Sequence, residues 1–263
     1  MDLGLRGKVA LVAAASRGLG RAVAEELAAE GASLVMCARG EQALQEAANA
    51  IRTSSGAEVE AVAADVSRAE DVERLVHAAI ERFERIDILV TNAGGPPSGT
   101  FDSLGPDKWE DAARLTLFST VNLCRAVLPG MKQRHWGRII NITSITVKQP
   151  VEGLMLSNSL RAAVTGFART LANEVARDGI TVNNILPGYT RTQRVEELAR
   201  ATAEREKITV AEAMRKSESQ IPMGRLGEPR EFAAVAAFLA SERASYVTGT
   251  SVQVDGGWIR SLV

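Results

Sequence analysis

Short apolar runs recur along the chain and alternate with longer segments in which apolar residues fall at helical spacing. A run of four to eight apolar or β-branched residues indicates a buried strand, and apolar residues three and four positions apart indicate an amphipathic helix. Helices are predicted near residues 21–30, 42–53, 69–85, 107–131, 160–177 and 229–241. Strands are predicted at residues 8–14, 33–38, 58–63, 87–91, 138–143, 180–186 and 251–254.

The alternation of strand and helix predicts the topology of the sheet. Parallel strands joined through helices make right-handed crossovers, and these place helices on both faces of the sheet. We therefore expect a single α/β domain over residues 1–263, with a Rossmann-type, doubly wound, mainly parallel sheet of seven strands. Residues 189–225 are polar and helix-prone and interrupt the alternation. Ligands of such sheets bind at the carboxyl ends of the strands, which is where we look for the site.

The balance of charges argues against a nucleic-acid partner. Lys and Arg number 31 and Asp and Glu number 32, so the chain has no basic footprint. No apolar run approaches the roughly 20 residues that cross a bilayer, and no signal-peptide pattern of charges precedes the first run. We therefore expect a cytoplasmic protein with no membrane partner. Two cysteines without a CxxC motif, Cys37 and Cys124, and two histidines predict neither a disulfide framework nor a metal site.

The segment AAASRGLG at residues 13–20 follows the first predicted strand and leads directly into a helix. Glycines here allow the backbone to approach a phosphate, and the first turn of the helix offers free N–H groups at the positive end of its dipole. The alternative is that the glycines only make a tight turn between strand and helix. The candidate cofactor-binding residues of this loop are Ala14, Ser16, Arg17, Gly18, Leu19 and Gly20.

Further small and polar residues stand at the ends of later strands. Asp65 and Val66 follow the third predicted strand, and Asn92, Ala93 and Gly94 follow the fourth. Because the carboxyl ends of parallel strands share one edge of the sheet, we expect these residues and the glycine loop to face the same ligand. The sixth strand ends at a further set of candidates, Pro187, Gly188, Thr190 and Thr192.

Together these motifs resemble those of the short-chain dehydrogenase/reductase family, over about residues 5–257. The family motif TGxxxGxG appears with Ala13 and Ala14 in place of its threonine and first glycine. The resemblance implies a nicotinamide dinucleotide cofactor and roles for three side chains. Asp65 would bind the adenine, Asn92 would support the central strand, and Thr192 would reach the nicotinamide carboxamide.

The end of the second strand distinguishes between the two nicotinamide cofactors. An acidic residue at this position binds the ribose of NAD(H), whereas this chain has Arg39 there. Arg39 and Arg17 can form charge-assisted hydrogen bonds with a 2′-phosphate, which favours NADP(H). The alternative is that both arginines are solvated surface residues.

The catalytic positions depart from the family pattern. Members of the family have a serine, then a YxxxK motif on the next helix, and an asparagine on the helix before. Ser144 matches the serine, and the usual spacing of thirteen residues leads to Ser157 and then to Arg161, so that YxxxK is replaced by SxxxR. Tyrosines occur only at positions 189 and 246, and neither has a lysine four residues later. Thr116 stands where the asparagine is expected.

These replacements predict slow or different chemistry. In the family the tyrosine exchanges the proton, and the lysine lowers its pKa and holds the nicotinamide ribose. The hydroxyl of Ser157 is much less acidic than a phenol, and Arg161 stays protonated and cannot relay a proton. Arg161 can still bind the ribose or an anionic substrate group, assisted by Lys148. Alternatively, Ser157 and Arg161 only pack in a relic site. Tyr189 either supplies a replacement hydroxyl or forms an aromatic wall of the pocket.

Two functions stay open on the sequence alone. The first is an NADP(H)-dependent oxidoreductase with an atypical catalytic centre that transfers a hydride to or from a carbonyl or alcohol substrate, similar to the 3-oxoacyl-carrier-protein reductases. The second is a non-catalytic or regulatory NADP(H)-binding protein of the same fold. The resemblance also implies that residues 189–225 form a substrate lid; the alternative is a mobile surface excursion with no role in recognition. It further implies that the protein is a homotetramer or, failing that, a dimer. Trp258 and Ile259 are expected to pack against a neighbouring subunit.

Overall fold

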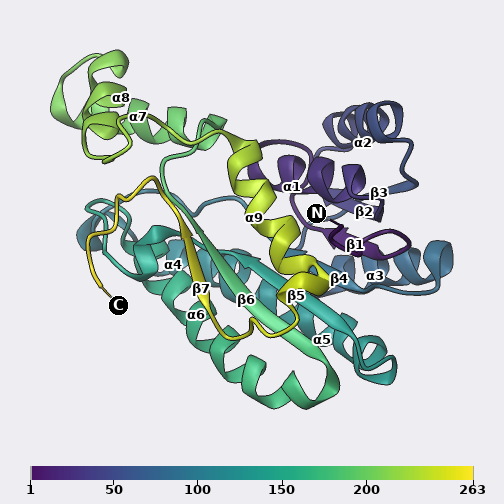
Figure 1. The fold of residues 1–263 in the computed structure, drawn as a ribbon. Coiled ribbons are helices and arrows are strands. Elements are labelled where there is room, and N and C mark those ends of the chain that lie inside the picture. Colours follow the sequence, from purple (N-terminus) through teal and green to yellow (C-terminus); the bar gives the residue numbers. More distant parts are fainter. Residues whose placement is uncertain (1, 263) are drawn as a thin grey trace.

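A fully parallel sheet runs through the centre of the structure (Figure 1). The computed structural model describes residues 2–262. The strand order is β3-β2-β1-β4-β5-β6-β7, so the chain builds the sheet outward from β1 in one direction and then from β4 in the other. The carboxyl ends of β1 and β4 flank the crevice at this reversal, where ligands bind in doubly wound sheets. The strands are β1 (Val9–Val12), β2 (Ser33–Ala38), β3 (Val59–Ala63), β4 (Ile88–Thr91), β5 (Gly137–Ile142), β6 (Ile180–Pro187) and β7 (Ser251–Val254).

The strands are apolar on both faces because helices cover both faces. Along β1, Ala10 and Val12 belong to one core, and Val9 and Leu11 belong to the core on the opposite side. This alternation is the two-residue period of a strand. On the first face lie α1 (Gly18–Ala29), α2 (Glu41–Ser55) and α9 (Pro229–Ala240); on the second lie α3 (Ala69–Phe83), α5 (Ser119–Gln133) and α6 (Met155–Val175). The predicted α/β fold is confirmed.

The predicted helix at residues 107–131 is divided into three parts. It consists of α4 (Pro106–Ala113), a π-helical turn η2 (Arg114–Phe118) and α5. The π turn inserts one residue into the helical repeat, which apolar spacing does not reveal, and such turns are frequent at functional sites. The next helix, α6, begins at Met155 rather than near residue 160. Both differences lie beside candidate site residues.

Residues 189–225 contain two further helices, α7 (Gln193–Glu206) and α8 (Val210–Ser219), which stand outside the main layers (Figure 1). Val195 of α7 packs in a small apolar cluster with Trp258 and Ile259. Those two residues are each only 9% exposed within their own chain. Both side chains thus pack mainly within their own chain, and a contact of theirs with a neighbouring subunit stays a prediction. Within the described residues, no helix combines the length and the apolar character needed to cross a membrane.

Candidate active site

The glycine loop lies between β1 and α1, at the reversal of the strand order. Gly18 has a φ of +60°, a left-handed conformation that glycine adopts freely. Gly20 has no room for a side chain, because a Cβ atom would contact the carbonyl oxygen of Ala14 and lie 2.7 Å from Nδ2 of Asn92. Nδ2 of Asn92 itself donates to that carbonyl oxygen at 3.4 Å. The amide of Asn92 thus ties the loop to the end of β4.

Ala14 stands at the position of the first glycine in the family motif. Its φ is +49°, a left-handed conformation that glycine adopts more readily than alanine. This conformation costs an alanine on the order of 1 kcal/mol. The surrounding structure therefore holds the alanine in a conformation that it rarely adopts on its own.

The first turn of α1 is an open site for an anion. The N-cap residue, Arg17, makes no side-chain capping bond, and no acidic residue lies in the first turn. The backbone N–H groups of this turn have no acceptor within the helix, and they sit at the positive end of the helix dipole. Of the other loop candidates, Ser16 is half-buried in the turn and Leu19 packs against the first core.

Arg39 and Asp65 follow the neighbouring strands β2 and β3, in which Ala38 pairs with Ala63. The Arg39 side chain is exposed and has no hydrogen bond or ion pair with any residue that the structure describes. The Asp65 carboxylate accepts bonds from the backbone N–H and the hydroxyl of Ser67, at 3.0 and 2.7 Å. The side chain of the neighbouring candidate, Val66, is buried in the second core.

The end of β6 and the start of α7 lie over the glycine loop. The methyl group of Thr192, the N-cap of α7, lies 3.8 Å from where a Gly18 Cβ would stand. Nη1 of Arg17 donates to Oε1 of Gln193 at 2.6 Å. Gly188, which donates its N–H to the Val254 carbonyl at 2.9 Å, holds β6 against the end of β7. Candidates from the glycine loop and from the end of β6, two distant parts of the chain, are therefore neighbours. The two remaining candidates of this segment are Pro187, the last residue of β6, and Thr190, which is buried.

Three hydroxyl-bearing residues form a short chain beyond β5. Oγ of Ser144 accepts the backbone N–H of Thr146 at 3.1 Å and so caps a 3-10 turn, η3 (Ile145–Val147). Oγ1 of Thr146 lies 3.5 Å from Oγ of Ser157, which is buried in the first turn of α6. Sequence reasoning paired Ser144 with Ser157 but missed Thr146, because a threonine two residues after a serine carries no signal.

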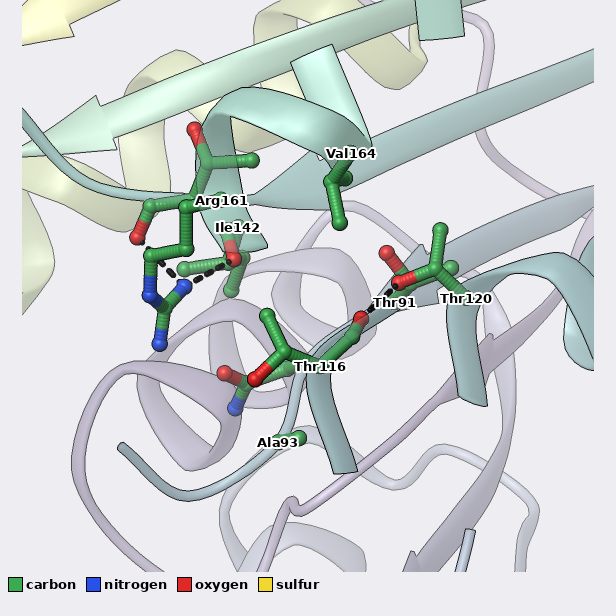
Figure 2. A pocket seen from close by; sticks show the side chains of 9 residues that line it. Thr91, Ala93, Thr116, Thr120, Ile142, Arg161 and Val164 are labelled. Atoms are coloured by element: carbon green, nitrogen blue, oxygen red, sulfur yellow. Dashed lines mark hydrogen bonds between the residues drawn. The ribbon is translucent and has the colours of Figure 1, made fainter. Parts of the chain in front are cut away.

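Arg161, one helical turn after Ser157, points back at the end of β5 (Figure 2). Its Nη1 donates to the main-chain carbonyls of Ile142 and Thr143, at 2.9 and 2.7 Å. Burial, followed by the charge of Arg194, lowers the pKa of Arg161 to about 10. That value lies well above neutral pH, so the guanidinium remains charged.

Arg194 was not singled out from the sequence, because it is one arginine in a polar segment. It projects from the first turn of α7 and donates from Nη2 to the Pro96 carbonyl at 2.8 Å. Its guanidinium lies against Gly95, where a Cβ atom would be 2.7 Å from Nε. Nη1 is 3.7 Å from a carboxylate oxygen of the exposed Glu197. Arg194 therefore links α7 to the loop that follows β4.

Thr116 lies in the π turn and lines the same hollow as Arg161 (Figure 2). Its side chain is 6% exposed, and within the described structure its hydroxyl has no hydrogen-bond partner. Its carbonyl accepts the Thr120 hydroxyl at 3.0 Å. A buried hydroxyl without a partner costs about 1–3 kcal/mol, so Oγ1 is available to a ligand. The hollow has a volume of about 260 Å³ when the part open to solvent is counted. Asn92 and Ala93 also line it. The next candidate, Gly94, is exposed.

Tyr189 lines a second hollow, of about 470 Å³ counting its open part. Its ring meets Trp258 edge to face, with centroids 6.1 Å apart, and burial raises the pKa of its phenol. Val195, Leu198 and Arg205 of α7 line the same hollow. Tyr189 thus forms an aromatic wall, and it does not line the hollow that contains Arg161. The two cysteines are buried, which raises the pKa of each thiol to about 12 and makes them poor nucleophiles.

Comparison with known sequences agrees with this architecture. The sequence profile of the family described as Enoyl-(Acyl carrier protein) reductase matches residues 13–259. The chain is 38% identical over 255 residues to 3-oxoacyl-(acyl-carrier-protein) reductase FabG of Vibrio cholerae, covering 97% of this chain and 98% of that protein. It is 36% identical to D-beta-hydroxybutyrate dehydrogenase of Cupriavidus necator, covering 97% of this chain and 99% of that protein.

Solved structures are similar over almost the whole chain. L-Sorbose reductase from Gluconobacter frateurii, complexed with NADPH and L-sorbose, has a TM-score of 0.94 and 36% identity, with full coverage of both chains. An actinorhodin polyketide ketoreductase with NADPH has a TM-score of 0.93 and 33% identity, covering 97% of this chain and 98% of that one. The sheet order, the glycine loop and these similarities lead to one conclusion: the chain belongs to the short-chain dehydrogenase/reductase family of oxidoreductases.

Proposed function

We propose that the protein is an NADP(H)-dependent oxidoreductase that interconverts a carbonyl compound and an alcohol. The observation that supports this most directly is that an open phosphate-binding loop at β1 and a donor-lined hollow at β4 and β5 share one edge of the sheet. A bound NADPH would supply the hydride that reduces the carbonyl carbon. The protein has to bind the substrate beside the cofactor and bring one proton to the carbonyl oxygen.

Support for NADP(H) comes from the fit of the loop and from the NADPH complexes of similar chains. The uncapped N–H groups of α1 suit the pyrophosphate, and the absent side chain at Gly20 lets the backbone come close. Arg39 is exposed and has no partner in the described structure, so it can pair with the 2′-phosphate. Arg17 would join it after releasing Gln193. Asp65 and the hydroxyl of Thr192 would bind the adenine and the carboxamide.

The preference for NADPH provides the first test. We expect NADPH to bind at least tenfold more tightly than NADH, and Arg39→Ala to remove most of that difference without weakening NADH, because only the 2′-phosphate pairs with this guanidinium. Fluorescence titration measures both affinities. Arg177→Ala, an exposed arginine that precedes β6 at the opposite edge of the sheet, is the matched control. Equal affinities for the two cofactors would contradict the proposal.

In the chemical centre, the hydroxyl of Ser144 would bind the oxygen of the substrate. Ser157, joined to Ser144 through Thr146, would hold a water molecule that delivers the proton, because a serine hydroxyl is too weak an acid to release its own. Arg161 would hold the ribose or the substrate through its free N–H groups. The helices α7 and α8 would cover the part of the substrate that extends into the hollow beside Tyr189.

One observation favours a second candidate, a non-catalytic NADP(H)-binding protein. Arg161 bonds two main-chain carbonyls of the segment after β5, and Ser157 is buried against Thr146. Bonds of this kind also serve simply to join α6 to the sheet. Both candidates require an intact cofactor site, so cofactor binding does not distinguish them. Only the enzyme would turn over a substrate.

The decisive experiment measures NADPH oxidation against ketones, quinones, enones and acyl thioesters, beside NADPH binding. For an enzyme, Arg161→Ala should lower turnover tenfold or more, and Ser157→Ala should lower it by about 10² to 10⁴ if Ser157 holds the relay water. The double variant Ser157→Tyr with Arg161→Lys restores the family pair and should raise carbonyl reduction. Tight NADPH binding with no turnover, unchanged in the alanine variants of Ser144, Ser157 and Arg161, would establish the second candidate.

A further inference from the structure

Arg161 is a partly buried cation without a counter-ion among the described residues. Its hydrogen bonds go to two neutral main-chain carbonyls, and among the described residues no carboxylate lies within ion-pair distance of it. Both bonds use Nη1, which leaves the donors on Nε and Nη2 without a protein acceptor. Removing a charge from water without a partner is expensive. The environment of Arg161 therefore favours a ligand that carries negative charge.

The hollow beside Arg161 offers donors and no acid. None of the residues that line it is Asp or Glu. Side-chain N–H or O–H groups come from Asn92, Arg161 and four threonines, and the hydroxyls of Thr91, Thr120 and Thr143 already donate to protein acceptors. The Thr116 hydroxyl is buried and has no hydrogen-bond partner in the part of the chain that the structure describes. This unused hydroxyl is a second and independent sign that an acceptor from a ligand belongs in the hollow.

Arg194 adds a second guanidinium at the same edge. It rests on Gly95 and bonds the Pro96 carbonyl, directly after Asn92 and Ala93, which line the hollow. After burial, the positive charge of Arg194 is the second cause of the lowered pKa of Arg161. The nearest acid to Arg194, Glu197, is exposed and 3.7 Å away, where water weakens the pair. Two positive charges repel each other, and an anion bound between them stabilises both.

We propose that Arg161 and Arg194 bind a carboxylate of the substrate, so that the physiological substrate is an oxo acid or a hydroxy acid rather than a neutral ketone. The proposal rests on the proposed function in that the ligand is the substrate of an oxidoreductase. Arg194 would be the specificity-determining residue. Because it is carried by α7, substrate binding would also hold α7 against the loop after β4.

The phosphates of the cofactor would have other partners. The uncapped first turn of α1 suits the pyrophosphate, and Arg39 after β2 suits the 2′-phosphate. In the sheet, β1 lies between β2 and β4, and β5 lies beyond β4, so the Arg161 hollow is on the far side of the crevice from Arg39. The guanidinium groups of Arg161 and Arg194 are therefore available to the second ligand, which is the substrate.

The test uses the full chain saturated with NADP⁺, which prevents turnover. Calorimetry measures the dissociation constants of pyruvate, acetoacetate and levulinate, each beside its methyl ester. We expect at least one of these acids to bind tenfold or more tightly than its ester. Arg194→Gln should abolish that preference, and Arg194→Lys should retain part of it, because it keeps the charge but loses the planar fork. Arg200→Gln, an exposed arginine of α7 beside Glu196, is the control and should retain the full preference.

Three results would overturn the proposal. The first is that no acid binds more tightly than its ester in the wild-type protein. The second is that the preference survives Arg194→Gln. The third is that Arg194→Gln weakens NADPH tenfold in a fluorescence titration, which would assign the pair to the cofactor. If the acid preference is present but no member of the wider panel is reduced, then the proposed catalytic function fails while the carboxylate site stands.

Discussion

At the scale of single residues, the glycine loop depends on two backbone conformations that the side chains must tolerate. Gly20 has almost no free space around it, because the carbonyl of Ala14 and the amide of Asn92 occupy the position of a Cβ atom. Ala14 has the space but adopts a left-handed φ of +49°. The two positions therefore respond in opposite ways to the exchange of glycine and alanine.

Gly20→Ala should displace the loop and weaken NADPH binding at least tenfold, since the added methyl group forces the Ala14 carbonyl or the Asn92 amide to move. Overpacking of this kind also lowers the free energy of unfolding by about 1–3 kcal/mol. Gly166→Ala is the control, because that glycine lies in α6 with nothing within 4 Å of its Cβ position. It should stabilise the helix by about 1 kcal/mol. Denaturation and NADPH titration of both variants measure the contrast, and equal behaviour would refute this account of the loop.

Ala14→Gly should leave the free energy of unfolding unchanged or raise it by up to about 1 kcal/mol. Glycine removes the left-handed strain of about 1 kcal/mol, and its greater freedom in the unfolded chain offsets part of that gain. Ala50→Gly, at an exposed position of α2, should instead lose about 1 kcal/mol. A loss at Ala14 equal to that at Ala50 would show that the alanine is not strained. Urea denaturation resolves the two variants.

At the scale of elements, the caps of the helices outside the sheet decide how firmly they cover the site. α8 starts with a capping box, in which Oγ1 of Thr209 accepts the Glu212 N–H at 3.2 Å and the Glu212 carboxylate accepts the Thr209 N–H at 2.8 Å. Helix α8 packs mainly on α7, through alanines of both helices. The local stability of α8 therefore depends on its cap more strongly than the stability of a helix packed on the sheet depends on its own cap.

Thr209→Ala should lower the local stability of α8 by about 1 kcal/mol, because one helix N–H loses its acceptor. Amide hydrogen exchange should then accelerate about fivefold over residues 210–219, while exchange in the sheet stays the same. Thr209→Ser keeps the hydroxyl and should behave like the wild type. If exchange accelerates in the sheet as well, α7 and α8 unfold together with the core rather than separately.

At the scale of the whole molecule, large apolar side chains remain on the surface. Phe118, in the π turn between α4 and α5, is 51% exposed, and Ile80 of α3 is 44% exposed. Helices beginning near Asp107 and Leu160 are the ones through which we expect subunits to pair. Phe118 belongs to the first of these stretches and Ile80 does not.

We expect a homotetramer, or failing that a dimer, in light scattering at micromolar concentration. Phe118→Lys should shift the particle toward smaller species, because burying a lysine at a subunit interface is costly. Ile80→Lys should leave the mass unchanged, since α3 lies outside the expected contact. A monomeric wild-type protein, or the same mass for both variants, would contradict the expected interface.

The sequence determined the fold for two reasons. Burial on both faces gives each strand a run of apolar residues, and the connections between parallel strands are almost always right-handed. All seven predicted strands are present, and the alternation with helices led to the parallel order. The glycine loop and the replacement of YxxxK by Ser157 and Arg161 were equally visible, since each lies within a few consecutive residues. The start of α6 and the π turn could not be predicted from the sequence, because the spacing of apolar residues does not encode them.

Only the tertiary structure decided which side chains share a site. It separated Tyr189 from Arg161 into different hollows, buried Trp258 in its own chain, and brought Thr146 between Ser144 and Ser157. It also placed the guanidinium of Arg194 on the loop after β4. Each of these relations joins elements that the sheet brings together, and side-chain distances between elements depend on packing, which local sequence patterns do not contain.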